Sequence, residues 1–250
     1  MRLALCRAAL GTGFTFFMTA FGAAMVFFLR GEPRPRFQKA LLGFAAGVMT
    51  AASVWSLLIP AMEQTAAEAR FPVWVPPTLG ILAGAAFLIA PDALPGLARR
   101  VPAPRRRTAL LVAAITLHNI PEGMAVGLAC ALSVRDGAAA GAAALALGIG
   151  IQNFPEGAAV SLPMCRECGS RGRAFLWGAL SGAVEPLFGL LAVFAASLAQ
   201  SLMPWLLSFA AGAMLYVTAE ELMPQAHSRA GTCGYLAGFL LMMVLDVALG

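Results

Sequence analysis

The sequence has little charge and an excess of apolar residues. Only 12% of its 250 residues are Asp, Glu, Lys or Arg, whereas 60% are hydrophobic and the mean hydropathy is +0.81. A soluble domain is usually about half apolar and about a quarter charged. The shortage of charge predicts a membrane protein with a single transmembrane domain over residues 1–250. The composition also excludes a nucleic-acid-binding domain. Such a domain needs a basic surface on a folded part outside the membrane, and the chain has no such part to carry its net charge of +5.

Three motifs that would indicate other protein classes are also missing. The uncharged stretch from Ala8 to Leu29 is longer than the ~7–15 residues of a signal-peptide core and shows no convincing cleavage site, so we expect a transmembrane helix there. No H-E-x-x-H zinc-hydrolase motif occurs. Cys165 and Cys168 form a single C-x-x-C in an expected cytoplasmic loop, without the second pair that a four-cysteine zinc site needs. A minor role for this pair in metal release is left open.

Long apolar runs fill the chain instead. A helix needs about 20 mostly apolar residues to cross a bilayer. The predicted fold class is therefore an all-α polytopic membrane protein with eight transmembrane helices, and re-entrant segments among the last three are the alternative. The predicted spans are residues 8–29, 40–62, 71–91, 108–134, 138–164, 174–199, 203–224 and 233–249.

Positive charges alternate from loop to loop. Cytoplasmic loops carry an excess of Lys and Arg, and 13 of the 17 positive residues fall in odd-numbered loops. We therefore expect a multi-pass protein of the cytoplasmic (inner) membrane with both termini outside. The odd-numbered loops hold Arg30, Arg34, Arg36, Lys39, Arg99, Arg100, Arg105, Arg106, Arg107, Arg166, Arg171, Arg173 and Arg229, and the other side receives Arg2, Arg7, Arg70 and Arg135.

A short repeat links the second and seventh spans. "FAAGVM" at residues 44–49 recurs as "FAAGAM" at residues 209–214, and the two spans run in opposite directions. This agrees with an inverted repeat, a recurring transporter architecture. Spans one to three would match spans six to eight, with spans four and five between the halves.

Glutamates occur in the middle of the predicted spans. Glu122, Glu156 and Glu185 lie near helix centres, and no span contains Lys or Arg to pair with them. A carboxylate at membrane depth is costly. Two interpretations remain: the glutamates are protonated, or they share a bound cation.

Other polar residues accompany these glutamates at helical spacing. Residues i, i+3 and i+4 share one helix face, so "HNIPEG" and "QNFPEG" each place three polar side chains on one face. Imidazole together with carboxylate suits divalent first-row metals. The side chains concerned are His118, Asn119 and Glu122 in span four, and Gln152, Asn153 and Glu156 in span five.

Proline and glycine follow the same pattern. Pro121 and Pro155 have no N–H and free the carbonyls one turn before them, which is tolerated at membrane depth where an ion or water is present. Gly123 and Gly157 allow helices to approach closely. One P-x-G motif alone would indicate a packing kink.

The paired "HNIPEGMAVGLA" and "QNFPEGAAVSLP" helices resemble spans four and five of the ZIP (Zrt-, Irt-like protein) divalent-metal transporters. "FAAGVMTAASVWSLLIPAME", "SGAVEPLFG" and "FAAGAMLYVTAEELMPQAH" resemble neighbouring spans of the bacterial branch. The resemblance covers nearly the whole chain. It implies eight helices with both termini outside, in agreement with the charge pattern.

The resemblance also implies a binuclear metal centre halfway across the membrane. His118, Glu122, Gln152 and Glu156 would hold one metal with help from Met49, a residue that by sequence alone is better explained as core. Asn119, Asn153 and Glu185 would hold a second, with Glu122 and Glu156 bridging. Ser56 would mark the outer entrance, and Glu220 and Glu221 the inner exit. Gln152 replaces the His of many family members and Asn153 replaces the Asp of some, and these neutral amides lower the negative charge of the centre.

The expected function is transport of zinc into the cytosol, and the chain is not expected to be an enzyme. Zn²⁺ is the first choice of substrate, with Cd²⁺, Fe²⁺, Mn²⁺ and Co²⁺ open. An intramembrane metal-dependent hydrolase and a passive metal channel are the alternatives. The lipid bilayer is an expected partner, and a homodimer is left open.

Overall fold

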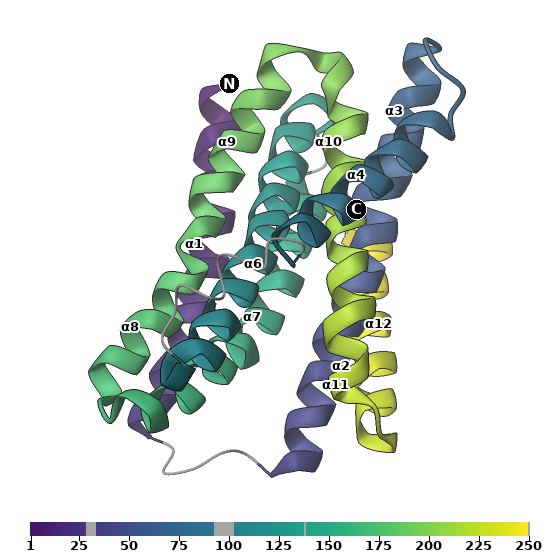
Figure 1. The fold of residues 1–250 in the computed structure, drawn as a ribbon. Helices are drawn as coiled ribbons and strands as arrows, with labels where there is room; N and C mark the ends of the chain where they lie inside the picture. Colours follow the sequence, from purple (N-terminus) through teal and green to yellow (C-terminus); the bar gives the residue numbers. More distant parts are fainter. Residues whose placement is uncertain (29–33, 93–102, 138, 250) are drawn as a thin grey trace.

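The computed structural model describes residues 1–28, 34–92, 103–137 and 139–249, and every regular element in these ranges is a helix (Figure 1). Eight helical segments correspond to the eight predicted spans. They are α1 (Arg2–Ala23) with the 3-10 turn Ala24–Phe27; α2 (Pro35–Ala52), the π-helical segment Ser53–Leu58 and α3 (Ile59–Glu68); α4 (Val75–Asp92); α6 (Ala103–Asp136); α7 (Ala139–Cys168); α8 (Arg171–Gly182) and α9 (Val184–Leu198); the 3-10 turn Gln200–Leu202, α10 (Met203–Val217), the π-helical segment Thr218–Leu222 and α11 (Met223–Ala226); and α12 (Arg229–Leu249).

Most of these segments are apolar enough to cross a bilayer. Five satisfy both length and hydropathy, namely Arg2–Phe27, Pro35–Glu68, Arg171–Leu198, Met203–Ala226 and Arg229–Leu249, and Val75–Ile89 is a shorter apolar helix. The remaining two, α6 and α7, are the longest helices described and carry the polar clusters. The expectation of an all-α polytopic membrane protein is confirmed.

Two expected loops are partly helical. Helix α6 starts at Ala103, so Arg105, Arg106 and Arg107 lie in its first turns. Pro104 favours this early start, because the N–H that it lacks has no partner in a first turn. Helix α7 continues to Cys168, so the C-x-x-C pair lies on its last turn. Of the loop arginines, Arg30, Arg99 and Arg100 lie outside the described residues.

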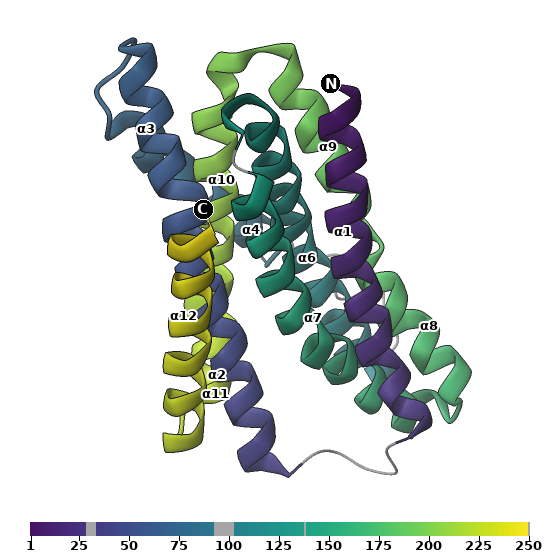
Figure 2. The ribbon, with the colours of Figure 1, turned by 180° about the vertical axis from the view of Figure 1, so that it is seen from behind.

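The helices form two groups that lie side by side (Figures 1 and 2). One group consists of α1, α6, α7, α8 and α9, and the other of α2, α3, α4, α10, α11 and α12. Within the first group α1 contacts α7 and α6 contacts α9; within the second α2 contacts α12 and α10 contacts α4. The groups meet where α6 contacts α10 and where α7 contacts α2 and α12.

These contacts have the symmetry that an inverted repeat predicts. Exchanging spans one to three with six to eight, and span four with five, turns the α2–α12 contact into α10–α4 and the α1–α7 contact into α9–α6. Both "FAAG" helices also widen into a π-helix nine residues after the phenylalanine, at Ser53 after Phe44 and at Thr218 after Phe209. π-Helical segments are rare in proteins overall, and those that occur are often found at functional sites.

Glycines bring the central helices into direct backbone contact. A methyl group added at Gly123 of α6 would collide with the backbone of Glu185 in α9, and one at Gly157 of α7 would collide with the backbone of Thr19 in α1. The predicted role of these two glycines in close helix approach is therefore confirmed.

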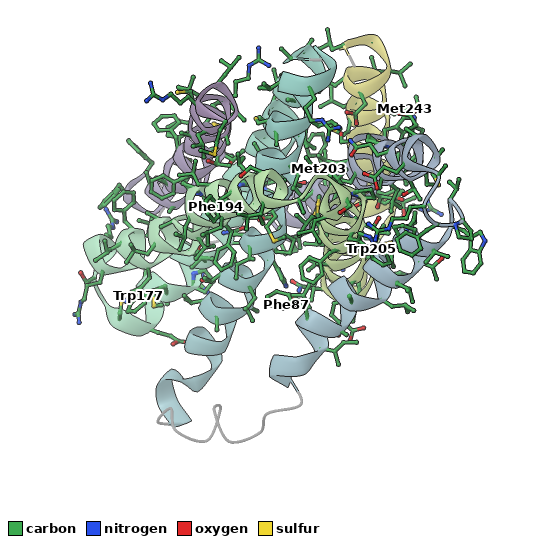
Figure 3. The ribbon with its side chains drawn as sticks, turned by 90° about the horizontal axis from the view of Figure 1, so that it is seen from above. Phe87, Trp177, Phe194, Met203, Trp205 and Met243 are labelled. Carbon is green, nitrogen blue, oxygen red and sulfur yellow. The ribbon has the colours of Figure 1, made fainter. Side chains whose placement is uncertain are left out.

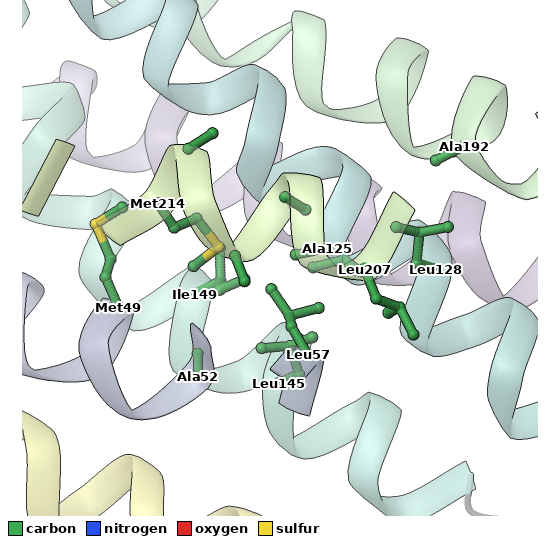
Figure 4. Packing of buried hydrophobic residues seen from close by; sticks show 14 of the residues in the cluster. Met49, Ala52, Leu57, Ala125, Leu128, Leu145, Ile149, Ala192, Leu207 and Met214 are labelled. Atoms are coloured by element: carbon green, nitrogen blue, oxygen red, sulfur yellow. The ribbon is translucent and has the colours of Figure 1, made fainter. Parts of the chain in front are cut away.

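Apolar side chains cover the outside of the bundle and also fill its interior. Large ones face outward, among them Trp177 and Phe194 (Figure 3), as expected for helices that contact lipid. Where the groups meet, Met49, Leu57, Ile149 and Met214 form part of a buried apolar cluster (Figure 4). Polar residues in the interior are therefore exceptions that need a physical reason.

Candidate metal site

The two polar clusters face each other across α6 and α7. The Gln152 side-chain amide donates a hydrogen bond from Nε2 to Oε1 of Glu122 at 2.7 Å. Both side chains are fully buried, with 0% of their surface exposed. Residues that are 30 positions apart, one from each P-E-G motif, are thus joined in the interior, as the spacing predicted.

A second pair extends the cluster to α9 and α1. Asn153 donates from Nδ2 to Oε2 of Glu185 at 3.0 Å, and the Thr19 hydroxyl donates to Oε1 of the same carboxyl group at 3.1 Å. Asn119 donates from Nδ2 to the backbone carbonyl of Ser181 at 2.8 Å. Helices α1, α6, α7, α8 and α9 therefore all contribute to one buried polar volume.

Several oxygen atoms in this volume have no hydrogen-bond donor among the described residues. They are Oδ1 of Asn119, Oε2 of Glu122, Oε1 of Gln152 and Oδ1 of Asn153. An unpaired buried acceptor costs roughly 1–3 kcal/mol, and four from adjacent helices are unusual in a packed interior. In each of these four side chains, the other polar atom of the amide or carboxylate group forms a hydrogen bond with a neighbouring residue. A cation is the species that would satisfy such oxygens together.

His118 and Glu156 lie toward the second helix group. Nε2 of His118 and Oε1 of Glu221 are 2.7 Å apart, with side-chain exposures of 10% and 35%. Glu156 is half-buried and within electrostatic range of both. The His118–Glu221 contact connects α6 to the π-helical segment Thr218–Leu222. Glu221, a predicted exit residue, therefore lies directly beside His118, a predicted metal ligand.

The other predicted residues are less closely joined to the cluster. Met49 is buried in the apolar cluster beside Met214 (Figure 4). Ser56 donates to Oδ1 of Asp246 at 2.6 Å, and Glu220 is exposed. Within the described ranges, no three His, Cys, Asp or Glu side chains are grouped closely enough to hold a metal by themselves. The amides Asn119, Gln152 and Asn153 would have to complete any such site.

Two participants were missed at the sequence level. Thr19 binds Glu185, and nothing in "TFFMTAF" distinguishes its hydroxyl from those of Thr12 and Thr15. Asp246 accepts a hydrogen bond from Ser56, and its Oδ2 is buried without a partner among the described residues. Its position in an apolar helix was a usable indication.

The fold and this centre define a polytopic membrane protein with a buried, cation-suited polar cluster. Residues 99–246 match the family model of the ZIP zinc transporters. The chain is 36% identical to human zinc transporter ZIP11 over 98% of its length and 97% of the relative's. It is 37% identical to zinc transporter ZIPB of Bordetella bronchiseptica (97% and 81% covered) and 30% identical to zinc transporter ZupT of Escherichia coli (88% and 90%). The chain belongs to the ZIP family.

Proposed function

We propose that this protein transports divalent metal ions, zinc first among them, across the cytoplasmic membrane into the cytosol. The family and the relatives named as zinc transporters support the activity. The observation that carries the location of the site is the set of four buried oxygens of α6 and α7 that find no hydrogen-bond donor among the described residues. A transporter needs no catalytic water or general base, and the chain lacks the H-E-x-x-H motif of a zinc hydrolase.

The centre would hold two ions. Glu122 and Gln152, which are hydrogen-bonded to each other, would bind one metal ion together with His118 and Glu156, and Met49 would be its softest ligand. The Asn153–Glu185 pair supports the other, completed by Asn119. Glu122 and Glu156 would bridge them. The uncharged amides lower the total negative charge of the centre, which favours release of an ion that the glutamates attract.

The path would pass from one helix group to the other. Ser56, with Asp246 beside it, would form the outer entrance, and Glu220 and Glu221 the inner exit. All ligands except Met49 belong to the group of α1, α6, α7, α8 and α9. Sliding or rocking of this group against the other would expose the centre to each side in turn, as inverted repeats permit.

The arrangement in the membrane follows from the positive loops. We propose a single transporter domain in the inner membrane with both termini outside, in contact with the lipid bilayer and open to assembly as a homodimer. Cd²⁺, Fe²⁺, Mn²⁺ and Co²⁺ are further candidate substrates, because affinity alone rarely selects among these ions.

The test is zinc uptake into proteoliposomes by wild-type protein, Glu122→Ala and Glu156→Ala. We expect saturable uptake that both substitutions reduce to the background of empty vesicles. Glu68→Ala, at an exposed glutamate outside the centre, is the control and should transport normally. Competition by the other ions ranks the substrates. Uptake that rises linearly with zinc would indicate a channel, and folded wild type that moves no divalent ion would refute transport.

A further inference from the structure

A cavity of about 400 Å³ that is open to the surface lies between α1, α6 and α7, near the end of the bundle where α1 begins. Its volume is in the range of roughly 300–1,000 Å³ typical of ligand sites. Small alanines of α7, including Ala142 and Ala146, form one wall, and Leu10 and Phe14 of α1 form another. The cavity lies away from the metal centre, since none of the predicted ligands lines it.

The cavity borders the surface that contacts lipid. Leu10 on its rim is 76% exposed, and Ala143 and Leu147 are exposed as well. These positions belong to helices that span the membrane, so lipid chains, and not water, surround the opening. An elongated apolar molecule from the bilayer is the occupant that such walls suit.

Among the described residues that line this cavity, Arg7 alone is charged. Its NH1 donates to Oγ of Ser133 at 3.0 Å and to the Ser133 carbonyl at 3.3 Å, which holds the side chain against α6. A guanidinium has five N–H donors in a fork that matches a phosphate, and the described hydrogen bonds use only NH1. The group is therefore positioned and retains donors for an anion.

The charge pattern makes this arginine unusual. Arg2, Arg7 and Arg135 lie on the side that the positive-inside rule predicts to be poor in positive charge. Arg135 is exposed at the end of α6, two residues after Ser133. An anion at this end of the bundle would compensate for charges that the topology disfavours.

We propose that this cavity holds an acyl chain of one anionic phospholipid, whose phosphate is bound by Arg7. The apolar walls take the chain, the guanidinium takes the phosphate, and Arg2 and Arg135 add the preference for a net negative headgroup. The bound lipid would connect α1, α6 and α7, which carry most of the candidate ligands. The proposal does not depend on the transported ion.

The test is native mass spectrometry of the purified protein with phosphatidylglycerol or phosphatidylcholine added. Two variants attack the site: Arg7→Gln removes the charge, and Ala143→Phe fills the cavity from an exposed position. Two variants are matched controls: Arg70→Gln removes an exposed arginine elsewhere, and Ala140→Phe adds the same ring at an exposed position of α7 that does not line the cavity.

We expect one tightly retained phosphatidylglycerol on wild type and on both controls. Arg7→Gln should weaken it at least about fivefold, the weight of one arginine at a membrane surface, and Ala143→Phe should abolish it. Inorganic phosphate should not displace it. Equal retention of phosphatidylcholine, or unchanged binding by Arg7→Gln, would refute the proposal. A dimer that Ala143→Phe dissociates would refute it too and assign this face to a second copy of the chain.

Discussion

At the residue scale, buried amides and hydroxyls hold the carboxylates of the candidate centre. Glu122 and Glu185 each receive a hydrogen bond from a neighbouring amide on α7, and Glu185 receives another from Thr19. These donors fix the direction of each carboxyl group before any ion arrives. Groups that orient metal ligands in this way typically contribute 10- to 100-fold in metal affinity.

Thr19→Val should therefore weaken zinc binding about tenfold, because valine keeps the shape of threonine and loses the hydroxyl that orients Glu185. Isothermal titration of the purified protein with zinc measures this. Thr12→Val is the matched control, since the Thr12 hydroxyl bonds only to the carbonyl of Ala8 in its own helix.

The comparison also distinguishes a role in binding from one in folding. If Thr19→Val and Thr12→Val have the same affinity, Thr19 does not position Glu185. If Thr19→Val loses affinity only together with its thermal stability, the hydroxyl serves the packing of α1.

At the element scale, glycine sets how closely the central helices approach. Gly157 of α7 lies against the backbone of Thr19 in α1, so an added methyl group must push these helices apart. We expect Gly157→Ala to lower stability by roughly 1–3 kcal/mol through overpacking. Thermal unfolding in detergent measures the loss, and zinc binding should fall with it because α1 and α7 both reach Glu185.

The control for this change is Gly13→Ala on α1, where an added methyl group meets nothing within 4 Å. Alanine has a higher helix propensity than glycine by about 1 kcal/mol, so this variant should be as stable as wild type or more so. Equal midpoints for the two variants would contradict the close approach.

Two π-helical segments are the other feature at this scale. Ser53–Leu58 and Thr218–Leu222 occupy equivalent positions of the repeat and contain Ser56 and Glu221, the residues that bond Asp246 and His118. The extra residue in such a turn rotates the following side chains on the helix. The segments thus bring the residues that we propose for the entrance and the exit into contact with α12 and α6.

At the scale of the whole molecule, the His118–Glu221 contact joins the two helix groups. Glu221→Gln removes the charge of this contact and keeps the length of the side chain. We expect uptake by proteoliposomes to fall severalfold, because the two groups are no longer linked in the same way. Zinc should still bind the central site in titrations, weakened by no more than the roughly tenfold that loss of a group orienting His118 costs. Glu68→Gln, at an exposed glutamate outside the proposed path, should leave both measurements unchanged.

The pair of measurements decides the role of Glu221. Lost binding would make it a ligand of the central site. Unchanged uptake would show that the contact has no part in transport.

The orientation of the bundle is a second prediction at this scale. In a cysteine-free background, Arg135→Cys should react with an impermeant maleimide from outside intact cells, whereas Gly172→Cys should react only after permeabilisation, because both positions are exposed but lie at opposite ends of α7. The reverse pattern would invert the topology and the direction of the proposed path.

The order and type of the elements were determined by the sequence alone. Apolar runs of spanning length predicted all eight helical segments, and the P-E-G spacing predicted which faces of α6 and α7 would meet. Both depend on local chemistry: a bilayer requires every backbone polar group to be satisfied within its helix, and residues three and four apart share a face.

Only the tertiary structure decided which groups share the centre and how. The hydrogen bond from Thr19 to Glu185, the contact of His118 with Glu221 and the hydrogen bond from Ser56 to Asp246 each join residues more than 100 positions apart. Nothing in the local sequence distinguishes these residues from others of the same type elsewhere in the chain. Their roles depend on how helices pack, which is set by the sum of many contacts across the bundle and not by any local pattern.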